Sequence, residues 1–94
     1  LHTLVRKVCH APAELFGVQE RGYIREGYFA DLTLIDDQAQ TSVRDEDVLY
    51  KCGWTPLAGI TLPAKISATW VNGQLAWDGE KVLPQRLGQR LRFG

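Results

Sequence analysis

The dipeptide Asn72-Gly73 is the feature that most restricts how this chain can fold. It stands between two segments rich in apolar and β-branched residues, 66–71 and 74–77. Asn-Gly is the favoured pair for a two-residue type I′ hairpin, because both central residues of that turn need a positive φ. A two-residue loop also fixes which residues pair across the strands. The predicted pairs are Val71 with Gln74, Trp70 with Leu75, and Ala68 with Trp77.

The predicted hairpin has one apolar face, because alternate residues of a strand point to the same side of a sheet. The side chains expected on that face are Ile66, Ala68, Trp70, Leu75 and Trp77. An apolar face must be covered by a second layer, so the hairpin predicts a partner layer. A second turn of the same kind, at Asp78-Gly79, is expected to bring residues 81–83 back alongside, and Pro84 is expected to end that strand.

The beginning of the chain predicts two short helices. Apolar residues recur at helical spacing up to Cys9. The residue before a proline avoids the α region, so Pro12 is expected to interrupt this first helix. Proline suits the first turn of a helix, so residues 12–16 are expected to form a second one. Gly17 is well placed to end it in a left-handed conformation.

Two internal segments predict further secondary structure. Residues 32–35 are apolar and β-branched and lead into a pair of aspartates, which indicates a buried strand. Residues 43–51 are ambiguous, because 48–50 fit either a strand or the end of a helical turn begun at 45–47. The expected fold class is α+β, with two short N-terminal helices followed by antiparallel strands.

Charge and composition narrow the class of protein. Eleven Lys and Arg balance eleven Asp and Glu, whereas a nucleic-acid-binding module usually carries a basic surplus. No apolar run approaches the roughly 18 residues that a membrane span needs. We therefore expect neither a nucleic-acid partner nor a membrane partner. Two cysteines do not make a disulfide framework and no signal-peptide pattern is present, so a cytoplasmic location is expected.

Candidate metal ligands are few. His2, Cys9, His10 and Cys52 are four possible ligands, and a metal site usually needs three or four. However, the adjacent Cys9 and His10 point to different sides of a helix. The simpler interpretation makes Cys9 a small core residue and His10 an exposed cation at a helix end.

Two charged clusters also carry no clear chemistry. The carboxylates at 36–37 and 45–47 lie at a strand end and in a polar loop, where solvated charge is the simpler interpretation. Arg86, Arg90 and Arg92 form a basic tail that suits phosphate or RNA, but the zero net charge and the lack of an aromatic platform favour a solvated tail. The residues themselves predict no catalytic, cofactor-binding or metal-binding position.

Five segments of the chain resemble the C-terminal end of cyclic amidohydrolases. Residues 10–18, 21–27 and 30–36 are similar to that family's helix with Pro-Ala and a closing glycine, its Gly-x-Ile-x-x-Gly step, and its Ala-Asp-Leu-x-Leu-x-Asp strand. Residues 51–59 resemble, more narrowly, the Lys-Cys loop of dihydroorotases, and 70–74 resemble the hairpin that follows it. Leu57 stands where this loop is expected to have phenylalanine.

This resemblance implies the C-terminal portion of a bacterial dihydroorotase, in which a TIM-type barrel accompanies a small β-sandwich built from both chain ends. Residues 1–20 would then be the last barrel helices, and 21–94 the C-terminal share of the sandwich. The implied activity interconverts N-carbamoyl-L-aspartate and dihydroorotate in pyrimidine biosynthesis. Zinc, held by histidines, a carboxylated lysine and an aspartate, activates the water. Those ligands would lie upstream, so catalytic, cofactor-binding and metal positions on this chain are expected to be none.

The partner implied by the resemblance is the N-terminal remainder of the same polypeptide, with a homo-oligomer also possible. The first residue, Leu1, is not methionine, which is expected of a piece of a longer protein or of a processed chain. Two alternatives stay open. One is a stand-alone β module that dimerises or binds another protein through its apolar face. The other is part of a different, hydantoinase-like cyclic amidohydrolase.

Overall fold

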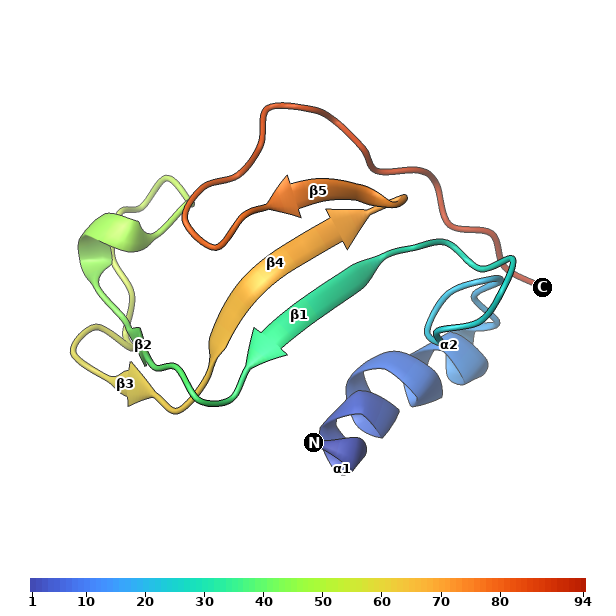
Figure 1. The fold of residues 1–94 in the computed structure, drawn as a ribbon, viewed down its shortest axis with the longest axis horizontal. Helices are drawn as coiled ribbons and strands as arrows, with labels where there is room; N and C mark the ends of the chain where they lie inside the picture. The colour runs from blue at the N-terminus through green and yellow to red at the C-terminus, as the bar shows by residue number, and fades with distance from the viewer.

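The structure is a computed structural model that describes all 94 residues. One N-terminal helix is followed by a three-stranded antiparallel sheet, in the order β1-β4-β5, and a two-stranded sheet of β2 and β3. The strands are β1 (Leu32–Asp36), β2 (Thr41–Ser42), β3 (Thr61–Leu62), β4 (Lys65–Val71) and β5 (Gln74–Trp77). The helix lies beside the larger sheet in Figure 1, and the short strands lie at the other end of the molecule. The chain is therefore a small α+β unit, and these residues form neither a barrel nor a sandwich.

The N-terminal helix is continuous, so the prediction of two helices broken before Pro12 is wrong. It runs through α1 (His2–Val5), the π-helical turn η1 (Arg6–His10) and α2 (Ala11–Phe16). The N–H of Ala11 bonds to the carbonyl of Arg6, five residues back. This wider turn relieves the clash between a proline ring and the preceding turn that would otherwise break the helix.

The helix ends where the sequence predicts. Gly17 has φ +64° and ψ +34°, in the left-handed region. The N–H of Val18 bonds to the carbonyl of Ala13 at 2.8 Å, and the N–H of Gly17 bonds to that of Glu14 at 3.3 Å. These two bonds form a Schellman motif, which satisfies carbonyls at the end of the helix. No helix in the chain combines the length and apolar character needed to cross a membrane.

The Asn72-Gly73 hairpin is confirmed, with φ +52° and +77° at its two central residues. The predicted pairs of Val71 with Gln74 and Trp70 with Leu75 are also present. The third predicted pair is wrong, because Trp77 pairs with Thr69 rather than with Ala68. The register shifts between the pair Thr69–Trp77 and the pair Trp70–Leu75. Ala76 on β5 therefore has no partner on β4, as in a β-bulge.

The second turn lies one residue later than predicted. Asp78 Oδ1 accepts hydrogen bonds from the backbone N–H groups of Glu80 and Lys81, both at 2.9 Å. Of the predicted turn pair, only Gly79 has a positive φ, +98°, so the turn centres on Gly79 and Glu80 rather than on Asp78 and Gly79. The return of the chain is confirmed, because Val82 pairs with Trp77.

The ambiguous segment 43–51 adopts the helical alternative. A short 3₁₀ turn, η2 (Asp45–Asp47), is present, and residues 48–50 form no strand. Residues 43–60 connect β2 to β3, and we call them the Trp54 loop. The loop is closed at its base by the bond from Gly59 N–H to the carbonyl of Val43, at 2.9 Å.

Only two residues, Ala13 and Ala68, are buried. The strand at β1 is confirmed, but its predicted burial is not found within this chain, because Leu34 and Ile35 remain exposed. Ile66, on the neighbouring strand, is exposed as well. The pairing of Leu32 with Trp70 and of Leu34 with Ala68 gathers these apolar residues on one face of the sheet, whereas Ile35 pairs with Ile66 beyond a register shift that follows Leu34. That face has no covering layer in these 94 residues.

Candidate functional site

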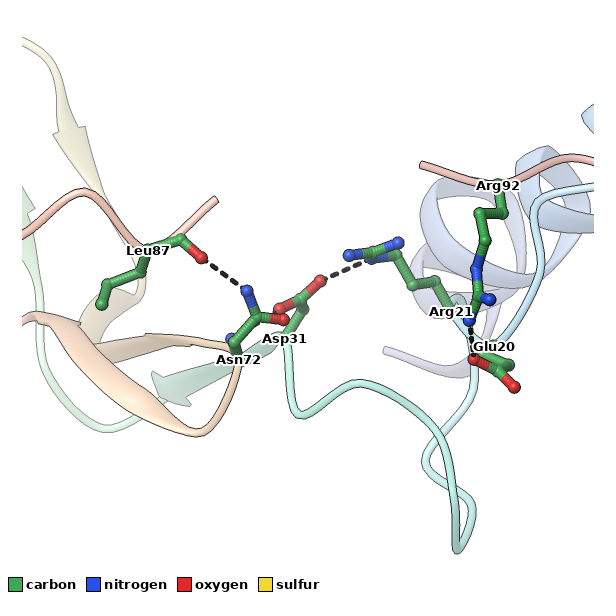
Figure 2. Close-up of polar contacts among 6 residues, drawn as sticks. All are labelled: Glu20, Arg21, Asp31, Asn72, Leu87 and Arg92. Carbon is green, nitrogen blue, oxygen red and sulfur yellow. Dashed lines mark hydrogen bonds and ion pairs between the residues drawn. The ribbon is translucent and has the colours of Figure 1, made fainter. Parts of the chain in front are cut away.

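The most connected polar cluster joins four parts of the chain, and we call it the junction cluster (Figure 2). Asp31, which directly precedes β1, accepts a hydrogen bond from Arg21 Nε at 2.8 Å. Its other carboxylate oxygen accepts the backbone N–H of Asn72 at 2.8 Å. The Asn72 side chain in turn donates Nδ2–H to the carbonyl of Leu87. One carboxylate therefore connects the segment after the helix to the hairpin tip, and the hairpin tip holds the C-terminal segment.

The ion pair in this cluster is partly sheltered from water. The Arg21 side chain is only 10% exposed, and its guanidinium carbon lies 3.9 Å from the ring centroid of Phe29. Burial alone would raise the pKa of Asp31, but the bonds from Asn72 and Arg21 outweigh it, so the pKa lies below its ordinary value. Asp31 is therefore an ionised anchor at neutral pH and not a proton donor.

A second ion pair ties the end of the chain to the helix exit. Arg92 Nη2 lies 2.7 Å from Glu20 Oε2 (Figure 2). The backbone adds bonds from Gln19 N–H to Arg92 O at 2.8 Å and from Gly94 N–H to Gly17 O at 2.9 Å. Arg92 remains solvated, with its side chain 62% exposed, but this ion pair holds it in place. Arg86 and Arg90 are exposed and form no ion pair.

His10 has a different role from the one predicted. It is half-buried rather than exposed, and its Nδ1 lies 2.6 Å from the carbonyl of Gly22. Its ring stacks on Tyr23, with 4.0 Å between the ring centroids and 8° between the planes. The Tyr23 hydroxyl donates to Glu14 on the helix. His10 therefore holds the segment after the helix against the helix, a structural contact.

The charged clusters also serve local structure. Arg44 Nε lies 2.8 Å from Asp47 Oδ2, and Asp45 Oδ1 accepts the backbone N–H of Thr55 at 2.8 Å. Asp36 and Asp37 are exposed at the end of β1, and Asp36 accepts the N–H of Gln38 at 2.9 Å. These carboxylates hold turns and ion pairs at the surface.

The junction cluster was not predicted from the sequence. Asn72 is recognisable only as a turn residue, and Arg21 and Asp31 only as members of resembling segments. Asn72 lies 41 residues from Asp31 along the chain, so no periodicity or spacing connects them.

Comparison with known proteins identifies the family. No protein-family model matches the chain. Individual relatives do match, and a dihydroorotase of Halobacterium salinarum is 38% identical over 81 residues, 83% of this chain. An N-acyl-D-aspartate deacylase of Alcaligenes xylosoxydans xylosoxydans is 37% identical over 94 residues, 100% of this chain. An allantoinase of Desulfitobacterium hafniense is 30% identical over 79 residues, 84% of this chain. The chain belongs to the amidohydrolase superfamily.

The chain spans about a fifth of the length of these amidohydrolases: 18%, 17% and 18% of the three relatives, respectively. The resemblance read from the sequence is thereby confirmed at the level of the superfamily. The particular reaction is not distinguished, because relatives with three different names match at similar identity.

The residues of this segment do not fit the metal of an amidohydrolase. No group of three or more His, Cys, Asp and Glu side chains comes together to hold a metal ion. Cys9 and Cys52 are both exposed, which also corrects the prediction of Cys9 as a core residue. His10 lies in the stack with Tyr23 described above.

Proposed function

We propose that the chain is the C-terminal, structural segment of a longer amidohydrolase of the dihydroorotase type. That enzyme would interconvert N-carbamoyl-L-aspartate and dihydroorotate. The match of 38% to a dihydroorotase over 81 residues carries this proposal. The Lys-Cys loop at 51–59, which resembles that of dihydroorotases more narrowly than that of their relatives, supports it.

The shape of the segment is consistent with a structural role. The three-stranded sheet leaves Leu34, Ile35 and Ile66 exposed, and an isolated sheet of this size needs a covering layer to be stable. The remainder of the longer polypeptide would supply that layer. Residues 1–20 would belong to its barrel domain, and 21–94 to a β-sandwich shared between the chain ends.

Catalysis and metal binding would reside outside these 94 residues. The metal is expected to be zinc, and its ligands would come from the remaining four-fifths of the enzyme. The role left to this segment is to complete the fold that positions them.

The test is an assay of the full-length protein with dihydroorotate and N-carbamoyl-L-aspartate, after metal removal and after addition of zinc. We expect interconversion that depends on zinc. Absence of turnover on both compounds, in a protein that is folded and metal-loaded, would contradict the proposal.

A second candidate is the removal of the acyl group from an N-acyl-D-aspartate. It is favoured by the deacylase relative, which matches at 37% over 100% of this chain. Both candidates act on an N-acylated aspartate, but the aspartates differ in their configuration at Cα and a different amide bond breaks. Opening of dihydroorotate breaks the amide to the β-carboxyl carbon, whereas deacylation breaks the amide at the α-nitrogen. Parallel assays with N-carbamoyl-L-aspartate and N-acetyl-D-aspartate separate the two candidates. A third assay with allantoin tests the activity in the name of the allantoinase relative.

A further inference from the structure

The Trp54 loop, residues 43–60, is held in one conformation by hydrogen bonds within the loop. Thr55 N–H bonds to Asp45 Oδ1 at 2.8 Å, and the Tyr50 hydroxyl donates to the carbonyl of Trp54 at 2.8 Å. Ala58 N–H bonds to the carbonyl of Thr55 at 3.2 Å. A loop fixed in this way loses little conformational entropy when it binds a partner.

This ordered loop presents large apolar side chains to solvent. Leu49 is 77% exposed, Trp54 59%, and Tyr50 and Leu57 about half. Tryptophan and tyrosine are the residues most enriched among those that dominate the energy of protein interfaces. Exposed aromatic residues on a preformed loop therefore indicate a docking surface.

The charged side chains of the loop indicate which kind of partner would bind it. Arg44 is paired with Asp47 at 2.8 Å and with Glu46 at 3.7 Å, and Asp45 is occupied by Thr55. Lys51 is the one basic side chain of the loop without an ion pair. A single lysine beside the exposed rings does not make a basic patch, so the surface does not suit a nucleic acid. It suits an apolar protein surface.

The occupant is indicated by the relatives. The deacylase match includes every residue of the loop, and this chain covers only 17% of that protein. A matching loop thus occurs in a protein with several times as much polypeptide. The loop lies at the opposite end of the molecule from the helix (Figure 1), so its docking site is separate from any that the helix makes.

The geometry points to the Trp54 loop as a preformed anchor that docks on the remainder of the same amidohydrolase polypeptide, with Trp54 and Tyr50 buried in that contact. This inference rests on the proposed function, since it needs the longer chain. The contact made by the Trp54 loop would be separate from the contact that covers the three-stranded sheet.

Hydroxyl-radical footprinting of the full-length protein, read by mass spectrometry, tests this anchor without any substitution. The oxidation rate of Trp54 is compared with its rate in the same protein unfolded in urea. We expect Trp54 to react about fivefold more slowly in the folded than in the unfolded protein if the ring is buried. A ring that stayed 59% exposed would slow by less than about twofold. Ile24, which is 89% exposed, is the internal control and should change by less than about twofold.

Two outcomes would overturn the anchor. One is a Trp54 that is no better protected than Ile24. The other is protection of Trp54 that disappears on dilution, which would make the occupant a second copy of the protein. The activity assay is independent of this readout. An inactive protein with a protected Trp54 counts against the proposed function alone, whereas an active protein with an accessible Trp54 counts against the anchor alone.

Discussion

The guanidinium of Arg21 and the carboxylate of Asp31 form an ion pair at 2.8 Å that joins the segment leaving the helix to the residue preceding β1. Asp31 also holds the hairpin tip through the N–H of Asn72. The second oxygen of one carboxylate thus extends the link from the helix exit to a residue 41 positions away. The effects of substitutions given below for stability are those expected in the full-length protein.

Asp31→Asn is expected to lower the free energy of unfolding by roughly 1–3 kcal/mol. The amide has one acceptor oxygen in place of two, so either Arg21 or Asn72 loses its partner, and Arg21 is largely buried. Urea unfolding measures the change. Asp37→Asn, an exposed carboxylate, is the control and should change stability by less than about 0.5 kcal/mol. Equal effects of the two substitutions would show that the ion pair contributes nothing.

The contribution of Asp31 depends on pH. Its pKa is lowered in the folded protein, so the unfolded state binds more protons as the pH falls. The stabilisation is fully present above the unfolded pKa of about 3.9 and is lost as the pH falls through the folded value. The stability difference between wild type and Asp31→Asn should therefore shrink below about pH 4. A difference that stayed constant down to about pH 2 would contradict this assignment.

Gly22→Ala should destabilise the protein more than Gly27→Ala. Both glycines have a left-handed φ, +87° and +80°, so the backbone strain of the two substitutions is similar. A methyl group at Gly22 would lie 2.8 Å from the carbonyl oxygen of Cys9 and closer still to the Cβ of Ala13, whereas Gly27 has open space. We expect a difference of about 1–3 kcal/mol in thermal or urea unfolding. Equal losses would mean that the segment after the helix does not pack on Ala13.

Gly73→Ala should weaken the hairpin by about 1–2 kcal/mol, because alanine is strained at its φ of +77°. Gly88→Ala is the matched control, since Gly88 lies outside the left-handed region and has open space around it. That control should be neutral or slightly stabilising. A Gly73→Ala protein with unchanged unfolding would argue against the type I′ turn.

Local features of the fold were predictable from the sequence. The conformations of Asn72, Gly73 and Gly17 follow from the backbone preferences of these residues alone, and all three were predicted. The pairing of Trp70 with Leu75 follows from a two-residue loop. Each of these features depends on neighbours within a few residues.

Features that depend on distant residues were not predictable. The bulge beside Thr69 shifts Trp77 by one residue, and a rule about turns says nothing of irregularities further along the strands. At Pro12 a π-helical turn overrides the local rule that ends a helix. The contact between Asp31 and Asn72 has no signature in spacing, because it forms only when the hairpin folds back beside β1.

We propose that the reactivity belongs to a longer amidohydrolase and that this segment only completes its fold. The decisive measurement is zinc-dependent turnover of dihydroorotate, made in parallel on the full-length protein and on the isolated 94-residue chain. We expect turnover by the full-length protein and none by the isolated chain, even after metal is stripped and restored. Turnover by the isolated chain would contradict it.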